Sequence, residues 1–151
     1  MVSWREFADA DAELSARVLE LFTSYKHHTV ATIRRDGSPR ISGTEVVFEE
    51  GELILGMMTG TRRAEDLLRD PRLAIHSHSV DPPEEGQGSW SGEAKLSGRA
   101  VPRPAGASGP SDADWFRVEL SAVVVTRLGD PADHLLIESW TPERGRVTQR
   151  R

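Results

Sequence analysis

The sequence of 151 residues contains no cysteine. Disulfide bonds, thiolate metal sites and cysteine nucleophiles are therefore excluded. The chain also lacks an excess of positive charge, because 19 lysines and arginines oppose 24 aspartates and glutamates and leave a net charge of −5. Broad binding to nucleic acid or to an anionic membrane requires a strongly basic face, so we expect neither partner.

Long hydrophobic runs are missing as well. The longest unbroken aliphatic run, from Ala122 to Val125, is too short to cross a bilayer. Residues 1–14 are polar and acidic and lack the apolar stretch of a secretory signal. The sequence shows no Walker loop, no zinc-ligand spacing and no Ser-His-Asp arrangement. These observations predict a cytoplasmic protein, and its length suits one domain over residues 1–151.

The sequence does contain a series of short strand patterns separated by turn residues. Alternating or β-branched runs predict seven strands, at residues 29–34, 39–48, 52–58, 72–79, 92–101, 116–127 and 134–140. Tight turns are predicted at 35–38 and 49–51, and flexible connections at 80–89 and 102–112. Many short strands with few helices are typical of a closed or half-closed β-barrel.

Two helices complete this prediction. Within an N-terminal helical segment (1–26), residues 9–24 carry an apolar stripe and predict an amphipathic helix capped by Asp9 or Asp11. Residues 61–69 predict a short helix that Asp70-Pro71 ends, with three residues facing inward: Ala64, Leu67 and Leu68. Residues 141–151 are predicted to form a polar tail.

The second helix begins on Thr61-Arg62-Arg63, directly after Gly60. The free N–H groups of a helix start are already positive, so arginines there cost about 0.3–1 kcal/mol. A bound anion removes this conflict, because the amides, the Thr61 hydroxyl and both guanidinium groups can point at it. Two interpretations follow: a phosphate site, or two solvated arginines on a helix face.

Several strand residues have two interpretations each. Gly43, within Ser42-Gly43-Thr44, either lets a flat ligand approach the backbone or marks a β-bulge. Glu45 either accepts a hydrogen bond from a ligand ring or pairs with a surface arginine. Met57 and Met58 either pack against an aromatic ligand or belong to the core.

Two histidines share one face of a predicted strand. His76 and His78 are alternate residues, a spacing that can hold a metal ion. The sequence offers no third ligand beside them, so we predict no metal site.

Several motifs resemble those of the flavin-binding split β-barrel proteins related to pyridoxamine 5′-phosphate oxidase. They are ATIRRDGSPR, GELILGMMTGTRRAEDLLRDPRLAIHS, LSGRAV and LLIESW. The resemblance covers most of residues 29–101 and 116–140. Its most specific part is TRRAEDLLRDPR, because the family places Ser or Thr, Arg and a basic residue at this helix start and Asn- or Asp-Pro-Arg after it.

The resemblance implies a mainly β (α+β) fold, a split β-barrel of six to seven antiparallel strands, and a homodimer with two flavin sites at the subunit interface. It implies that the flavin phosphate is held by Thr61, Arg62 and Arg63. It places along the flavin ring and ribityl chain the residues Ser42, Gly43, Thr44, Glu45, Met57, Met58 and Thr59. It also implies that Trp140 and a basic residue, Arg146 or Arg150, reach the cofactor of the other subunit.

The resemblance therefore predicts an FMN- or F420-dependent oxidoreductase, with FMN ahead of F420, that transfers a hydride to or from a small substrate. The oxidase's Arg-x-His pair after the tryptophan is missing, since residues 146–148 read Arg-Val-Thr. Pyridoxamine-phosphate oxidation is thus not expected. Two other functions stay open: a non-catalytic binder of flavin or haem, with His76 or His78 as iron ligand, and a dimeric scaffold without a small ligand.

Overall fold

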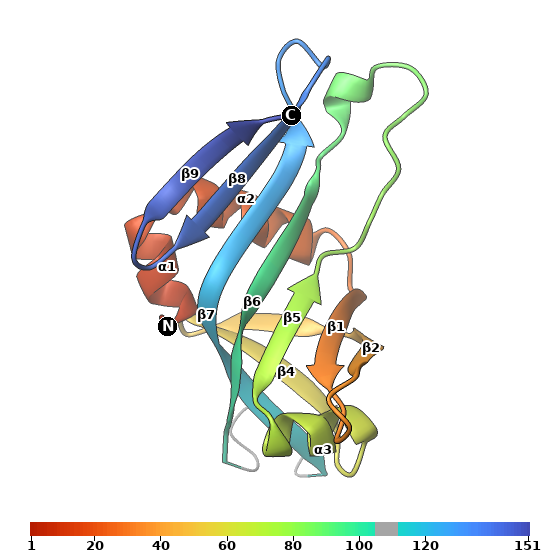
Figure 1. The fold of residues 1–151 in the computed structure, drawn as a ribbon, viewed down its shortest axis with the longest axis vertical. Coiled ribbons are helices and arrows are strands. Elements are labelled where there is room, and N and C mark those ends of the chain that lie inside the picture. Colours follow the sequence, from red (N-terminus) through yellow and green to blue (C-terminus); the bar gives the residue numbers. More distant parts are fainter. Residues whose placement is uncertain (105–111) are drawn as a thin grey trace.

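The computed structural model describes residues 1–104 and 112–151, so most of the predicted connection at 102–112 lies outside the described residues. Its elements are drawn in Figure 1. In chain order they are α1 (Trp4–Ala10), α2 (Ala12–Thr23), β1 (His28–Ile33), β2 (Pro39–Thr44), β3 (Val46–Glu49), β4 (Glu52–Met58), α3 (Arg62–Arg69), β5 (Arg72–His76), a 3₁₀ helix (Gln87–Ser89), β6 (Glu93–Pro102), β7 (Ala113–Leu128), β8 (Leu135–Thr141) and β9 (Gly145–Arg150).

The strands of the described residues form one antiparallel sheet in the order β2-β1-β5-β6-β7-β4-β3. The long strand β7 pairs with β6 along one edge and divides its other edge between β4 and β8. The sheet curls so far that its end strand β2 comes close to β4. The prediction of a mainly β, antiparallel barrel with a few short helices is therefore confirmed.

Two strand predictions are corrected. The run 39–48 is broken at Glu45, because β2 pairs with β1 whereas β3 pairs with β4. The tail predicted at 141–151 forms β9, which pairs with β8 after a turn in which Gly145 has a φ of 65°. The first three residues of β9 are half-buried and its last three are exposed, so the strand lacks the apolar alternation by which a sequence predicts a strand. The described residues thus hold nine strands where the sequence predicted six to seven.

The helices also differ from prediction in detail. The helix expected at 9–24 starts at Ala12, with the Asp11 carboxylate accepting the N–H of Leu14 at 3.1 Å. A separate helix, α1, precedes it and is capped by Ser3 and Glu6, whose side chains each bond to the other's backbone. In α3, Leu68 is 62% exposed and faces solvent, contrary to the prediction that it points inward. No helix of the described residues is long and apolar enough to cross a membrane.

One hydrophobic core fills the barrel and extends beneath the N-terminal helices. In Figure 1, α1 and α2 lie beside β8 and β9, away from α3 at the opposite end of the sheet. Phe7 of α1 packs against Trp140 with ring centroids 4.7 Å apart, and Trp4 packs against Phe48 at 4.6 Å. The N-terminal helices therefore cover a part of the barrel that lies away from α3.

A buried histidine joins α2 to the sheet. The Nε2 atom of His28 lies 3.0 Å from the carbonyl oxygen of Phe22, and its Nδ1 atom accepts the backbone N–H of His78 at 3.1 Å. The carbonyl requires a donor and the N–H requires an acceptor, so the neutral ring protonated on Nε2 satisfies both. Burial, reinforced by the charges of His78 and His27, lowers the pKa of His28.

We expect acidification to weaken the fold through His28. Because its pKa is lower in the folded state, the stabilisation is complete above the unfolded pKa near 6.5 and declines as the pH falls below it. Between pH 7 and 5.5 this site should cost up to about 1 kcal/mol of unfolding free energy. Urea denaturation should show a flatter pH dependence for His28→Gln than for His27→Gln, a change at an exposed neighbour. Equal slopes for the two variants would contradict this assignment.

Candidate functional site

A cleft of about 440 Å³ lies where β2 approaches β4 without hydrogen bonding to it in the described sheet. We call it the seam cleft. It brings together six of the predicted site residues, which come from β2, from Glu45 directly after it, from β4 and from the start of α3. Its lining consists of His27, Gly43, Thr44, Glu45, Gly56, Met57, Met58 and Arg63.

Gly43 lies in a regular part of the sheet. The register of β1 and β2 runs without a shift from His28↔Thr44 to Ile33↔Pro39, so the described strand has no bulge at this glycine. A Cβ atom built on Gly43 would meet nothing within 4 Å. The backbone here is therefore open to an approaching ligand rather than crowded by its own chain.

Gly56, on the opposite wall of the cleft, has a different role. A Cβ atom there would lie 2.5 Å from the ring of Trp115, its partner on β7, so only glycine lets this ring lie across the strand. Neither Gly56 nor Trp115 is among the site residues predicted from the sequence. A glycine inside an otherwise apolar strand was the available signal, because it often marks a close approach.

The start of α3 is fixed to the seam by its first residues. The Thr61 side chain caps the helix by accepting the N–H of Ala64 at 3.4 Å. Arg63 reaches across the seam and donates from Nη1 to the carbonyl oxygen of Gly43. Its Nε atom is buried and has no hydrogen-bond partner among the described residues. A buried donor without an acceptor is costly, so an anionic or carbonyl ligand in the cleft would satisfy it.

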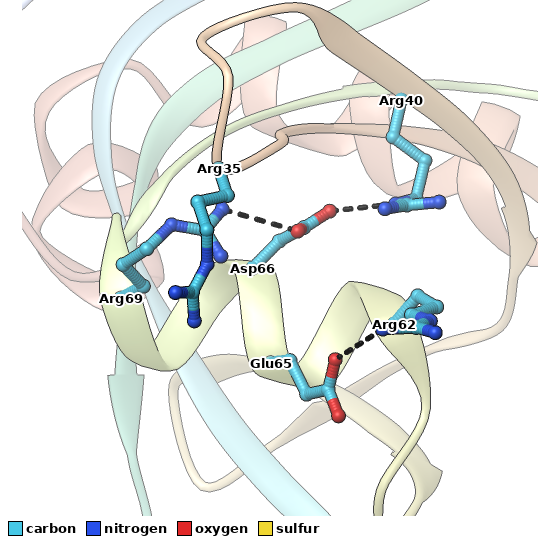
Figure 2. A pocket seen from close by; sticks show the side chains of 6 residues that line it. All are labelled: Arg35, Arg40, Arg62, Glu65, Asp66 and Arg69. Carbon is cyan, nitrogen blue, oxygen red and sulfur yellow. Dashed lines mark hydrogen bonds and ion pairs between the residues drawn. The ribbon is translucent and has the colours of Figure 1, made fainter.

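The side chains of Arg62 and Arg63 do not meet at one site. Its side chain is 79% exposed and lies 3.4 Å from Glu65 on the same helix. It lines a second, larger cleft of about 550 Å³, which we call the arginine cleft and which shares no residue with the seam cleft. Figure 2 shows its lining: Arg35, Arg40, Arg62, Glu65, Asp66 and Arg69.

The remaining predicted residues of this region lie around the seam cleft. The Glu45 carboxylate lies 3.6 Å from the ammonium group of Lys26 and 3.8 Å from the ring of His27, and it pairs with no arginine of the described residues. Met57 is buried in the core, whereas Met58 is 75% exposed. Two others lie outside the lining: Ser42, paired with Val30 on β1, and Thr59, whose N–H bonds to Asp112.

Trp140 and Arg146 lie away from the seam cleft of their own chain. Trp140 is 3% exposed and packs against Phe7 in the core. Arg146 bonds to three carboxylates, those of Asp11, Glu13 and Glu138, and so connects β9 to the N-terminal helices. In the described structure both residues hold the fold together.

A third cleft, of about 490 Å³, lies on the outer face of the sheet and is called here the apolar cleft. Its His76 donates from Nδ1 toward the carbonyl of Ser77 at 2.7 Å, and its Nε2 lies 3.4 Å from Glu93. His78 instead stacks on Tyr25 at 4.2 Å. The described residues include no group of three acidic or histidine side chains arranged to hold a metal ion. The lining of the apolar cleft consists of Thr29, Ala31, Ile41, Ala74, Ile75, His76, Ser79, Lys95 and Ser97.

Solved structures show which fold this is. No family model and no curated protein matches the sequence. PhzG from Burkholderia lata 383, solved with tetrahydrophenazine-1-carboxylic acid, superposes with a TM-score of 0.66 and 10% identity, over 98% of this chain and 92% of PhzG. A candidate pyridoxamine 5′-phosphate oxidase from Listeria innocua superposes with a TM-score of 0.60 and 11% identity, over 75% of this chain and 98% of that one. The chain has the pyridoxamine 5′-phosphate oxidase-like split-barrel fold.

The split barrel is also the fold of a protein described as heme binding. A heme binding protein from Mycobacterium smegmatis superposes with a TM-score of 0.57 and 16% identity, over 89% of this chain and 85% of that one. Identities this low carry the fold and no activity. The function must therefore be argued from the clefts of this chain.

Proposed function

We propose that this split barrel binds a phosphate-bearing flavin, FMN or F420 with FMN ahead, in the seam cleft and acts as a flavin-dependent oxidoreductase on a small substrate. The observation that carries the proposal is Arg63. It is anchored to Gly43 across the seam and keeps a buried Nε donor without a partner among the described residues. A phosphate at the start of α3 would accept from this guanidinium and from the first amides of the helix.

The rest of the seam cleft fits the flat part of such a ligand. Gly43 leaves its backbone open, and Met58 is an adaptable apolar side chain at the opposite edge. A bound flavin supplies the hydride chemistry. The chain would hold the phosphate at Arg63 and orient the ring along β2 and β4. We assign no side chain as catalytic acid or base.

We include a second copy of the chain in the same proposal. The outer face at the apolar cleft carries small and apolar side chains, and Ile41 on it is 75% exposed. Burial of the apolar part of such a face against its own copy removes apolar surface from water and so favours association. A homodimer would also place a second chain at the rim of each flavin site.

Flavin binding should raise the melting temperature of the purified protein. A ligand that binds only the native state at 100 times its dissociation constant stabilises it by about 2.7 kcal/mol, which corresponds to about 5–10 °C for a chain of this size. We expect this shift with FMN or with F420 in a comparison that also includes FAD and haem. No shift with either of the first two, at concentrations up to 1 mM, would contradict the proposal.

Haem binding is the second candidate, and the apolar cleft is the observation that favours it. His76 lines this cleft of about 490 Å³, and its Nδ1 is engaged with the carbonyl of Ser77, so Nε2 is the nitrogen that could bind iron. Glu93 lies 3.4 Å from that nitrogen and would compete with an iron ion for it. A Soret band on haem addition that disappears in His76→Ala, without any flavin-induced shift, would favour this function over the first.

A further inference from the structure

The arginine cleft is built around one buried carboxylate. Asp66 on α3 is 3% exposed. Its Oδ2 atom accepts from the Thr32 hydroxyl at 2.8 Å and from Nε of Arg40 at 2.7 Å, while Oδ1 accepts from Nη2 of Arg69 at 3.1 Å. Burial acts to raise the pKa of Asp66, but the bonds from Arg40, Thr32 and Arg69 outweigh it and hold that pKa below its usual value. Asp66 is thus ionised and fixes two guanidinium groups (Figure 2).

These bonds leave donors facing the cleft. Arg40 uses only Nε, and no described residue bonds to either of its terminal nitrogens. Arg69 bonds to Asp66 and to the carbonyl of Ile33 through Nη2 alone. Guanidinium groups held in one orientation lose little further entropy when they bind an oxyanion.

Positive charge in the cleft exceeds negative charge. Four arginines and two carboxylates line it, which leaves a formal charge of +2 in a chain whose net charge is −5. Arg35, in the turn after β1, has neither a hydrogen bond nor an ion pair from its side chain within the described residues. Arg62 and Glu65 are both more than half exposed, so their pair is weak and leaves Arg62 able to turn toward a ligand.

A purely structural role explains part of this arrangement. Asp66 connects α3 to β1 and β2, and the Nε of Arg40 and Nη2 of Arg69 are needed for that connection. This role does not account for Arg35 or for the terminal nitrogens of Arg40. The unexplained groups are all positively charged hydrogen-bond donors, and they line one cleft.

We propose that the arginine cleft binds a phosphate-type dianion at a site separate from the seam cleft. Paired guanidinium groups match the oxygens of phosphate geometrically and by charge. The lining is almost wholly charged, so it would recognise the anionic group itself rather than an apolar body. This site does not depend on the proposed flavin function, because the two clefts share no residue.

Calorimetric titration at constant ionic strength tests the site. Pyrophosphate, inorganic phosphate and ADP serve as probes, on the full chain and on the variant Arg35→Gln. We expect pyrophosphate to bind at least about tenfold more weakly to Arg35→Gln, the factor for losing one charge-assisted hydrogen bond. The matched control is Arg34→Gln, which removes the same charge from the preceding, exposed residue outside the cleft and should bind like the unaltered chain.

Each outcome decides the proposal. Tighter binding of ADP than of pyrophosphate supports a site for a phosphate group carried on a larger molecule, and equal binding supports a site for the free anion. Two results overturn it: no binding of any probe, or equal loss of pyrophosphate affinity in Arg34→Gln and Arg35→Gln. A protein that binds pyrophosphate but no flavin keeps this site and refutes the proposed function alone.

Discussion

Glu138→Ala is expected to lower the unfolding free energy by about 3 kcal/mol. The Glu138 side chain is 4% exposed and accepts from three arginines: Arg127 Nε at 2.9 Å, Arg17 Nη1 at 3.1 Å and Arg146 Nη1 at 3.2 Å. These arginines come from β7, α2 and β9, so one carboxylate on β8 connects four elements. Its removal leaves three cations together without their shared partner.

The expected cost is at the lower end of the range of about 3–5 kcal/mol measured for broken buried ion pairs. The three arginines retain 26–30% side-chain exposure and can recover some hydration. A suitable control is Glu119→Gln, which breaks one partly exposed pair with Arg117 and should cost no more than about 1 kcal/mol. Urea denaturation at pH 7 measures both, and equal losses would show that the buried network adds nothing.

The effect of Glu138→Ala should also depend on pH. Burial acts to raise the pKa of Glu138, but the hydrogen bond and charge of Arg127 and the charge of Arg17 outweigh it, so the pKa is lowered in the folded state. The contribution is therefore complete above the unfolded pKa near 4.3 and is lost as the pH falls through the folded value. The difference between the unaltered chain and the variant should shrink below about pH 4.

Local signals account for the elements that the sequence predicted well. The run 52–58 is apolar on both faces and forms β4, which pairs on both edges, with β3 and with β7. Thr61 caps α3, and its C-cap is Asp70 before Pro71. The break at Glu45 had no such signal, because the sequences of β2 and β3 both favour a strand. The two strands differ only in the partner with which each one pairs. Pairing across the barrel is a tertiary fact that a local pattern does not contain.

The sequence predicted the part of the candidate site that has local signals and missed the part that depends on contacts between distant segments. Gly43, Met58 and Arg63 were named from the sequence and meet in the seam cleft. The arginine cleft was missed, since the pair Arg40 and Asp66 is separated by 26 residues in the chain. One signal was present: Asp66 precedes Leu67 on the buried side of α3, and a buried carboxylate on a helix needs a cationic partner. That neighbouring arginines diverge was also foreseeable, because successive helix residues point about 100° apart.

Arg63→Ala is expected to weaken FMN binding by about 10- to 100-fold, since charge-assisted hydrogen bonds are worth about 1.5–3 kcal/mol. Arg62→Ala is its matched control, because it removes the same group from the preceding residue, which is 79% exposed and lies outside the seam cleft. That change should cost less than about threefold, and Arg62→Ala/Arg63→Ala should resemble Arg63→Ala. Fluorescence titration of FMN measures all three variants.

Titration with riboflavin distinguishes the contribution of the phosphate to the affinity from that of the ring. Riboflavin keeps the ring and ribityl chain of FMN but carries no phosphate, so its affinity should be equal in the unaltered chain and in Arg63→Ala. If both ligands lose affinity together, Arg63 acts by holding α3 to Gly43, and the buried Nε atom has no role toward phosphate. If FMN affinity falls with Arg62→Ala and not with Arg63→Ala, the phosphate lies in the arginine cleft. In that case the Nε atom of Arg63 does not receive the flavin phosphate, and the seam cleft loses the observation on which its assignment depends.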